Sequence, residues 1–358
     1  MKTNDYTLRD DEKIIFALRS LFEKYGYAQY KMVKFEEYDL YVRNKEFLVS
    51  DNIITFNDTS GKLMALKPDV TLSIIKNTKD NPDGIRKVYY NENVYRVSKS
   101  SKAFRELMQV GLECMGSIDG YCISETLSLA AMSLKIISDS SILSITDLDV
   151  ISYVINLVTD DSRLASELLA LAGEKNLHGI AALCAENGIS DEKCGLFCKV
   201  VALHGRPGAV IEKLREIIPD CPALIPLSDT VRSLGEYEDM LELDFSYSGN
   251  IKYYNGIVFK GYVDDVPACV LSGGQYDKLM AKMGRKSKAI GFAVYLDELE
   301  KILSKGKQYD VDTLLIYGDG TDRKALTEKV KELAQGGSSV LALRNVPPKL
   351  RYRQLIEI

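Results

Sequence analysis

Two groups of strand-like segments, separated by a long helical block, place the strongest constraint on how this chain can fold. Segments rich in β-branched and aromatic residues lie at about 86–97, 107–116 and 144–150, and such segments resume after residue 240. Between them, from about 151 to 218, apolar residues recur at helical spacing almost throughout. Because short links join most of the strands, we expect a mainly antiparallel sheet that is interrupted by a helical subdomain at about 151–225.

The segments around this block also have recognisable patterns. Before it we expect, in order, a helix over 11–25, extended chain over 27–41, a hairpin of 53–56 with 62–66, a short helix begun by Pro68–Asp69, and a helix over 124–137. After it we expect antiparallel strands at 240–247, 252–263 and 268–274, a helix at 276–283, a strand at 289–295 and a helix at 296–303.

The end of the chain has a different pattern. A strand at 312–319, a helix at 321–335 and a strand at 339–345 form a β-α-β unit, which predicts the start of a parallel sheet. We therefore expect an α+β protein in two parts: a core over 1–306 and a small α/β segment over 307–358. The second part is smaller than most independent domains.

Composition narrows the class of protein. The net charge of −5 gives no general attraction to nucleic acid, so we do not expect nucleic-acid binding as a main function. No run approaches the roughly 18 apolar residues that cross a bilayer, and the polar N-terminus lacks the apolar core of a signal peptide. The seven cysteines, an odd number, favour a reducing compartment over a disulfide framework. We expect a cytoplasmic protein without a membrane partner.

One group of cysteines allows two interpretations. Cys194 and Cys198 are four apart on an expected helix, with Cys184 before them and His204 after. A metal or redox site is possible, but paired CxxC spacing is absent and the chain holds only two histidines. Small thiols also pack well as apolar residues inside helical bundles. We therefore predict no metal site and no cofactor.

A set of polar and aromatic residues is suited to hold a small zwitterion. Strand alternation puts Gln109, Gly111 and Glu113 on one face, and burying such a polar pair is costly without partners. Asp69 and the pair Tyr253–Tyr254 are further candidates. Simpler roles remain open for each of them. Asp69 can cap the helix it begins, Glu113 can lie on the surface, and the tyrosines can be ordinary strand aromatics.

Six segments in a fixed order carry a resemblance to a known family. They are LKPDVT, YR, FRELMQVGLE, YYNGIVF, GGQYD and GFAVYLDEL, spread between residues 66 and 299. Over about residues 8 to 305 the chain resembles histidyl-tRNA synthetase of the class II type. The resemblance implies a class II synthetase-like antiparallel sheet flanked by helices, and it implies that residues 307–358 correspond to part of an anticodon-binding domain.

The resemblance also implies roles for matching residues. Asp69 and Thr71 match the pair that holds the amino group of histidine. Gln109 and Glu113 match residues that contact the substrate, and Tyr253 and Tyr254 match the tyrosines beside the imidazole. Arg96 matches an arginine that grips the α-phosphate, although an ion pair with Glu113 or Glu92 is an alternative.

The chain departs from the family at positions that serve adenylate formation. Ser98 occupies the position of the glutamate that reads adenine in the family. Ala103, Gly249 and Glu298 occupy positions where the family has arginines. Val33 occupies the position of a proline in the first conserved motif of the family. Phosphoryl chemistry depends on preorganised cations, and loss of one such donor typically costs about 2.7–4 kcal/mol. We therefore expect a pocket that binds an amino acid and does not activate it.

This combination resembles the family of ATP phosphoribosyltransferase regulatory subunits. Members lack aminoacylation activity and assemble with a short-form catalytic subunit. The resemblance implies a homodimer of the synthetase-like core within a hetero-octamer, and histidine as an effector that acts by feedback on the first step of histidine biosynthesis. Two alternatives stay open at this point: an active histidyl-tRNA synthetase, and a stand-alone amino-acid sensor or RNA-binding module.

Overall fold

A computed structural model describes residues 8–45, 48, 53–97, 103–246, 253–299 and 309–358. The chain divides into two compact units, Met1–Ile302 and Leu303–Ile358. The larger unit is built on a nine-stranded sheet. The smaller unit has a sheet of its own.

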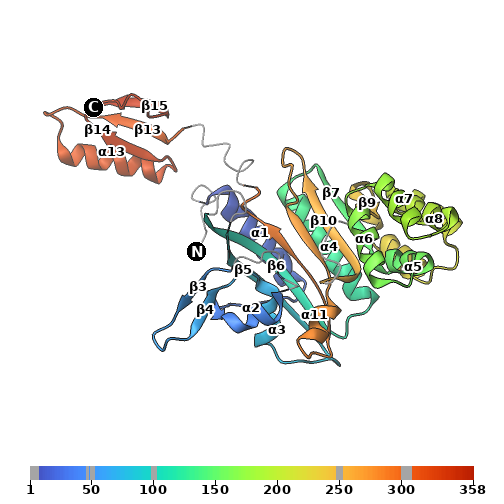
Figure 1. The fold of residues 1–358 in the computed structure, drawn as a ribbon. Coiled ribbons are helices and arrows are strands. Elements are labelled where there is room, and N and C mark those ends of the chain that lie inside the picture. The colour runs from blue at the N-terminus through green and yellow to red at the C-terminus, as the bar shows by residue number, and fades with distance from the viewer. Residues whose placement is uncertain (1–7, 46–47, 49–52, 98–102, 247–252, 300–308) are drawn as a thin grey trace. The chain divides into compact units, whose positions relative to one another are not determined.

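The large sheet is antiparallel over most of its width (Figure 1). Its strands, in spatial order, are β1 (Ala28–Gln29), β5 (Ile85–Val97), β6 (Phe104–Gly116), β12 (Lys288–Tyr295), β11 (Leu271–Gln275), β10 (Asn255–Val263), β7 (Ser141–Asp147), β9 (Leu241–Asp244) and β8 (His204–Gly205). The expected α+β fold, with an antiparallel sheet flanked by helices, is confirmed. One pairing was wrongly predicted: β9 does not lie beside β10, because β7 separates them and runs parallel to β9.

One face of this sheet packs against α1 (Asp10–Lys24) and α4 (Gly120–Ile137). Helix α1 confirms the helix expected at 11–25, and it buries Leu18 and Phe22 completely. The Phe22 ring meets Phe292 of β12 edge-on at 5.9 Å between ring centroids, and Phe292 meets Phe259 of β10 at 6.1 Å. These rings form the core between the sheet and the two helices.

A second hydrophobic cluster covers part of the opposite face. It includes residues of α3 (Val70–Asn77), α11 (Asp277–Lys282) and a small sheet of β2 (Phe35–Glu37), β4 (Leu63–Leu66) and β3 (Thr55–Asn57). The β3–β4 hairpin and α3 are confirmed. The extended chain expected over 27–41 is wrong at its end, where α2 (Tyr38–Arg43) begins. Tyr41 is fully buried in this cluster, so tertiary packing overrides the local preference of the segment.

Between β7 and β9 the chain is mainly helical. The helices are α5 (Leu148–Val158), α6 (Ser162–Gly173), α7 (Leu177–Glu186), α8 (Asp191–Val201), α9 (Pro207–Ile217) and α10 (Leu224–Ser233). Asp147, Asp161, Asn176 and Ser190 cap the first four by accepting hydrogen bonds from backbone N–H groups. Figure 1 shows these helices gathered at the β7–β9 side of the sheet.

The cysteine group lies inside this helical block. Cys184 of α7 is buried, and Cys194 and Cys198 of α8 are partly buried. Burial raises the pKa of the Cys184 thiol to about 12, so the thiol stays protonated. Among the described residues, no group of three or more His, Cys, Asp or Glu side chains is arranged to hold a metal ion.

The smaller unit is a three-stranded parallel sheet with one helix. Its elements are β13 (Val311–Ile316), α13 (Arg323–Gln335), β14 (Val340–Leu343) and β15 (Tyr352–Glu357), with β13 in the centre. The β-α-β unit was predicted, whereas β15 was not. The helix expected at 296–303 is a turn over the described residues 296–299, and its remainder lies outside the described part. No helix in the described part of the chain is long and apolar enough to cross a membrane.

Candidate functional site

A cavity of about 400 Å³ lies on the face of the large sheet that α3 and α11 also flank. Its walls include every residue that the sequence singled out for ligand contact. These are Asp69, Thr71, Arg96, Gln109, Glu113, Tyr253 and Tyr254. They come from α3, β5, β6 and the chain just before β10, so the fold gathers positions that are almost 190 residues apart in sequence. Their role in binding stays a prediction.

Strand register explains why there is room for polar side chains on the floor of the cavity. Glu113 of β6 lies opposite Gly291 of β12, and Gly111 lies opposite Ala293. A Cβ at Gly291 would lie 1.9 Å from the Glu113 Oε2 atom, and one at Gly111 would lie 2.4 Å from the Tyr90 hydroxyl. Only glycine therefore leaves room for these two polar groups. The alternation that predicted Gln109 and Glu113 on one face agrees with their place in one cavity.

Glu113 is the most unusual group in the cavity. It is 2% exposed, and it accepts hydrogen bonds from the Thr71 hydroxyl at 2.7 Å and the Tyr276 hydroxyl at 2.6 Å. Burial raises the pKa of this carboxyl to about 8; the two hydroxyls lower it only in part, and nearby Asp69 raises it further. Glu113 is therefore mostly protonated at neutral pH. The interpretation of Glu113 as a surface residue is wrong.

Asp69 has a structural role and a place in the cavity at the same time. Its carboxylate accepts a hydrogen bond from the Leu72 backbone N–H at 2.9 Å. The interpretation of Asp69 as the cap of α3 is therefore confirmed. Burial raises its pKa, against the effects of the α3 backbone N–H groups and of Arg96. Half-buried Asp69 and buried Glu113 both line the cavity, so a ligand ammonium would find two acids there.

Arg96 lies at the rim of this group. Its Nε donates to the Pro68 carbonyl oxygen at 3.3 Å. The ion pair proposed for it is wrong within the described part of the chain, because Glu92 pairs with Lys67 at 3.0 Å and Glu113 bonds to hydroxyls. Lys67 is fully buried, so this pair fixes the strand that leads into α3.

Three of the tyrosines that line the cavity lie close together. The rings of Tyr253 and Tyr254 are 4.4 Å apart between centroids, and Tyr253 lies 6.0 Å from Tyr276. Tyr253 and Tyr254 precede β10, which begins at Asn255, so they are not ordinary strand aromatics. Sequence reasoning missed Tyr276 as a site residue, although GGQYD contains it. It also missed four further residues that line the cavity: Tyr90, Lys260 and Ser272, which lie outside the six segments, and Tyr295, which lies in GFAVYLDEL.

The positions that depart from the synthetase pattern supply no described arginine to the cavity. Ala103 and Glu298 are exposed and are absent from its walls. Ser98 and Gly249 lie outside the described residues. Val33, at the position of the first motif's proline, is 58% exposed. Arg96 is the one arginine on the described walls of the cavity.

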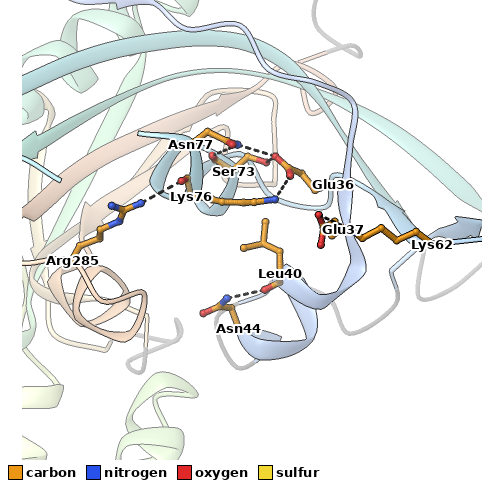
Figure 2. Close-up of polar contacts among 9 residues, drawn as sticks. All are labelled: Glu36, Glu37, Leu40, Asn44, Lys62, Ser73, Lys76, Asn77 and Arg285. Atoms are coloured by element: carbon orange, nitrogen blue, oxygen red, sulfur yellow. Dashed lines mark hydrogen bonds and ion pairs between the residues drawn. The ribbon is translucent and has the colours of Figure 1, made fainter. Parts of the chain in front are cut away.

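The far end of α3 is held by a separate polar cluster (Figure 2). Buried Glu36 of β2 accepts hydrogen bonds from the Lys76 ammonium at 2.6 Å and the Asn77 amide at 2.9 Å. Arg285 donates to the Ile75 carbonyl at 2.8 Å. Because α3 begins in the cavity and ends in this cluster, Glu36 helps fix the direction in which Asp69 and Thr71 face.

Comparisons with known proteins agree with this geometry. The sequence model of the histidyl-tRNA synthetase family matches residues 5–299. An ATP phosphoribosyltransferase regulatory subunit from Oceanobacillus iheyensis is 24% identical over 340 residues, which cover 92% of this chain and 83% of that protein.

Two solved structures share the fold. One, an ATP phosphoribosyltransferase regulatory subunit/histidyl-tRNA synthetase from Bacillus halodurans C, has a TM-score of 0.78 at 21% identity and covers 100% of this chain and 98% of its own. The other, an ATP phosphoribosyl transferase (HisG:HisZ) complex from Thermotoga maritima, has a TM-score of 0.64 at 22% identity and covers 80% and 97%.

The antiparallel sheet, its flanking helices and the cavity on one face therefore define a class II synthetase-like protein. Within that class, the chain belongs to the histidyl-tRNA synthetase family. Its predicted resemblance to ATP phosphoribosyltransferase regulatory subunits is confirmed by the relatives it matches.

Proposed function

We propose that this chain is a non-catalytic regulatory subunit that activates a short-form ATP phosphoribosyltransferase and takes part in feedback control by histidine. One observation carries the proposal. A single cavity gathers the two acids, the amide and the tyrosines suited to an α-amino acid, while Ala103 and Glu298 stand where a synthetase would place arginines. The proposal is supported by the names of the similar proteins.

The cavity's chemistry suits recognition better than activation. Asp69 and Glu113 offer carboxyl oxygens to an ammonium, and Gln109 offers an amide to a polar side chain. Activation would need cations around a pentavalent phosphorus, and each lost donor typically slows such chemistry by about 10²–10³. We infer that catalysis on ATP and phosphoribosyl pyrophosphate belongs to the partner chain.

Regulation then requires the amino acid to favour one state of an assembly. Such coupling is typically about 1–3 kcal/mol between sites. We propose a homodimer of the synthetase-like core within a hetero-octamer with the catalytic chain. The HisG:HisZ complex among the similar structures supports a catalytic partner. Light scattering of the mixed subunits tests this stoichiometry.

The main experiment is a transferase assay with a short-form catalytic subunit from the same source. We expect activity to rise when this chain is added and to fall as histidine is titrated. A catalytic subunit whose rate is unaffected by this chain at all histidine concentrations would contradict the proposal.

The second candidate is an active histidyl-tRNA synthetase. The family match and the retained Arg96 favour it. It predicts histidine-dependent exchange of pyrophosphate into ATP by the purified chain. We expect no exchange above the rate without histidine, and a robust rate would replace the regulatory assignment.

A further inference from the structure

A second cavity lies beside the first on the same face of the sheet. It measures about 270 Å³, and it lies over β10, β7 and β9, next to the end of α6. The described residues that line it are mainly polar and include Ser144, Lys175, Asp244, Lys260 and Tyr262. No motif in the sequence pointed to it.

Strand register shows why the two cavities adjoin. Lys260 of β10 lies opposite Ser272 of β11 on one side and Ser144 of β7 on the other. Ser272 lines the first cavity and Ser144 lines the second, while Lys260 lines both. Side chains directly opposite one another in neighbouring strands share a face. Lys260 is therefore placed at the boundary between the two spaces.

The lining of the second cavity favours an anion with several oxygens. Lys175 and Lys260 bring two ammonium groups, and Ser144 and Tyr262 add hydroxyls that can donate. The one carboxylate on the described walls is Asp244, and its oxygens already accept bonds. One takes the Ser246 backbone N–H at 2.8 Å, and the other takes the Lys175 ammonium at 3.3 Å. These bonds hold the pKa of Asp244 below its usual value although burial acts to raise it.

The backbone at Lys175 supplies an independent observation. Helix α6 ends at Gly173, and Lys175 follows with φ of 55°, in the left-handed region that favours glycine. Its N–H donates to the Ala172 carbonyl at 3.0 Å, the usual bond of such a helix end. A lysine at this position is strained where a glycine would not be. Strain of this kind occurs at functional sites, and here it places an ammonium at the second cavity.

We propose that the second cavity binds the phosphate group of a small molecule, held by Lys175 and Lys260 and by the surrounding hydroxyls. Ammonium and hydroxyl donors are the groups that phosphate oxygens accept from in proteins. The site adjoins the amino-acid cavity and shares Lys260 with it, and the proposal does not depend on the regulatory role proposed above. A free phosphate ion and a phosphate ester that carries hydroxyl groups share this chemistry.

Calorimetric titration at constant ionic strength tests the proposal with two probes, inorganic phosphate and glycerol 3-phosphate. We expect both to bind the wild-type chain. Tighter binding of the ester would assign a hydroxylated ligand, and equal binding would assign phosphate alone. Absence of binding by both probes would overturn the proposal.

Three variants make the test specific. Lys175→Gly relieves the strained backbone, so we expect thermal stability to be kept or raised while phosphate binding weakens roughly tenfold or more. Lys260→Ala should weaken it similarly, with folding checked by the same melting curve. Lys199→Ala, an exposed lysine of α8, is the control and should bind as the wild type does. Wild-type phosphate affinity in both Lys175→Gly and Lys260→Ala would show that the cavity is not the site.

Discussion

Helix α3 has a buried acid at each end, and the two acids are held in opposite ways. At its first turn, Glu113 reaches the Thr71 hydroxyl, and the described partners of its carboxyl are neutral hydroxyl groups. At its last turn, Glu36 meets the Lys76 ammonium and the Asn77 amide. Both carboxyls are less than a tenth exposed.

The difference separates a structural site from the predicted binding site. A buried carboxylate with a cation partner is already compensated, so Glu36 needs no ligand. Glu113 avoids an uncompensated charge by keeping its proton, as its raised pKa of about 8 indicates. A cationic ligand group would supply the missing partner. This is the physical reason to predict a ligand at the cavity end of α3, whereas Glu36 holds the other end of the helix in place.

The largest expected effect comes from removing the compensated acid. Glu36→Ala leaves the Lys76 ammonium and the Asn77 amide without their shared acceptor. We expect the free energy of unfolding to fall by about 3 kcal/mol, measured by urea denaturation.

The matched control is Glu37, the next residue on β2. Its ion pair with Lys62 is exposed, with half of each side chain open to solvent (Figure 2). Glu37→Ala should cost less than about 1 kcal/mol. Equal losses in the two variants would refute the structural role given to Glu36.

At the cavity end, the larger effect should be on affinity. Glu113→Ala and Tyr254→Ala each remove a wall of the predicted amino-acid site. Hydrogen bonds to charged groups are worth about 1.5–3 kcal/mol, so we expect histidine to bind roughly thirtyfold more weakly to Glu113→Ala. Calorimetry measures this directly. Wild-type affinity in both variants would place the histidine site elsewhere.

Much of this site could be predicted because its residues obey short-range rules. Alternation along β6 put Gln109 and Glu113 on one face, and helix-start chemistry identified Asp69 as a cap. The hairpin of β3 and β4 and the β-α-β unit near the end also follow from turns and periodicity that lie within a few residues.

The remainder depends on contacts between distant segments. No recognisable helix-start signal precedes α2. This helix forms because the Tyr41 ring packs into a core built by α3 and β5. The place of β9 next to β7 is set by a parallel pairing across about 100 residues. Lys260 lines both cavities because β10 lies between β11 and β7. Tyr276 belongs to the site because its hydroxyl donates to Glu113 of β6. The raised pKa of Glu113 needs burial, which no local pattern reports.

A smaller effect is expected for each unit by which pH is varied. The pKa of Glu113 is about 8 in the folded chain, above the ordinary value of 4.5 expected when unfolded. Between these values the folded state holds a proton that the unfolded state lacks, so stability is full below about pH 4.5 and is lost as pH rises through about 8.

The slope contributed by one such group is at most about 1.4 kcal/mol per pH unit. Glu113→Gln cannot titrate, so its free energy of unfolding should fall less steeply over this window than that of the wild type. Asp147, whose pKa burial raises to about 7, is present in both proteins and cancels in the difference. Parallel pH profiles would show that Glu113 is ionised in the folded chain.

The smallest expected change in stability separates the two roles of Asp69. Asparagine caps a helix about as well as aspartate, whereas alanine loses about 1 kcal/mol at such a position. Asp69→Asn should therefore keep the bond to the Leu72 N–H and leave the melting temperature nearly unchanged, while Asp69→Ala lowers it. If Asp69 also holds a ligand ammonium, both variants should lose histidine affinity, because neither carries the charge. Full histidine affinity in Asp69→Asn would show that Asp69 acts only as a helix cap. The ligand ammonium would then contact Glu113 and not Asp69.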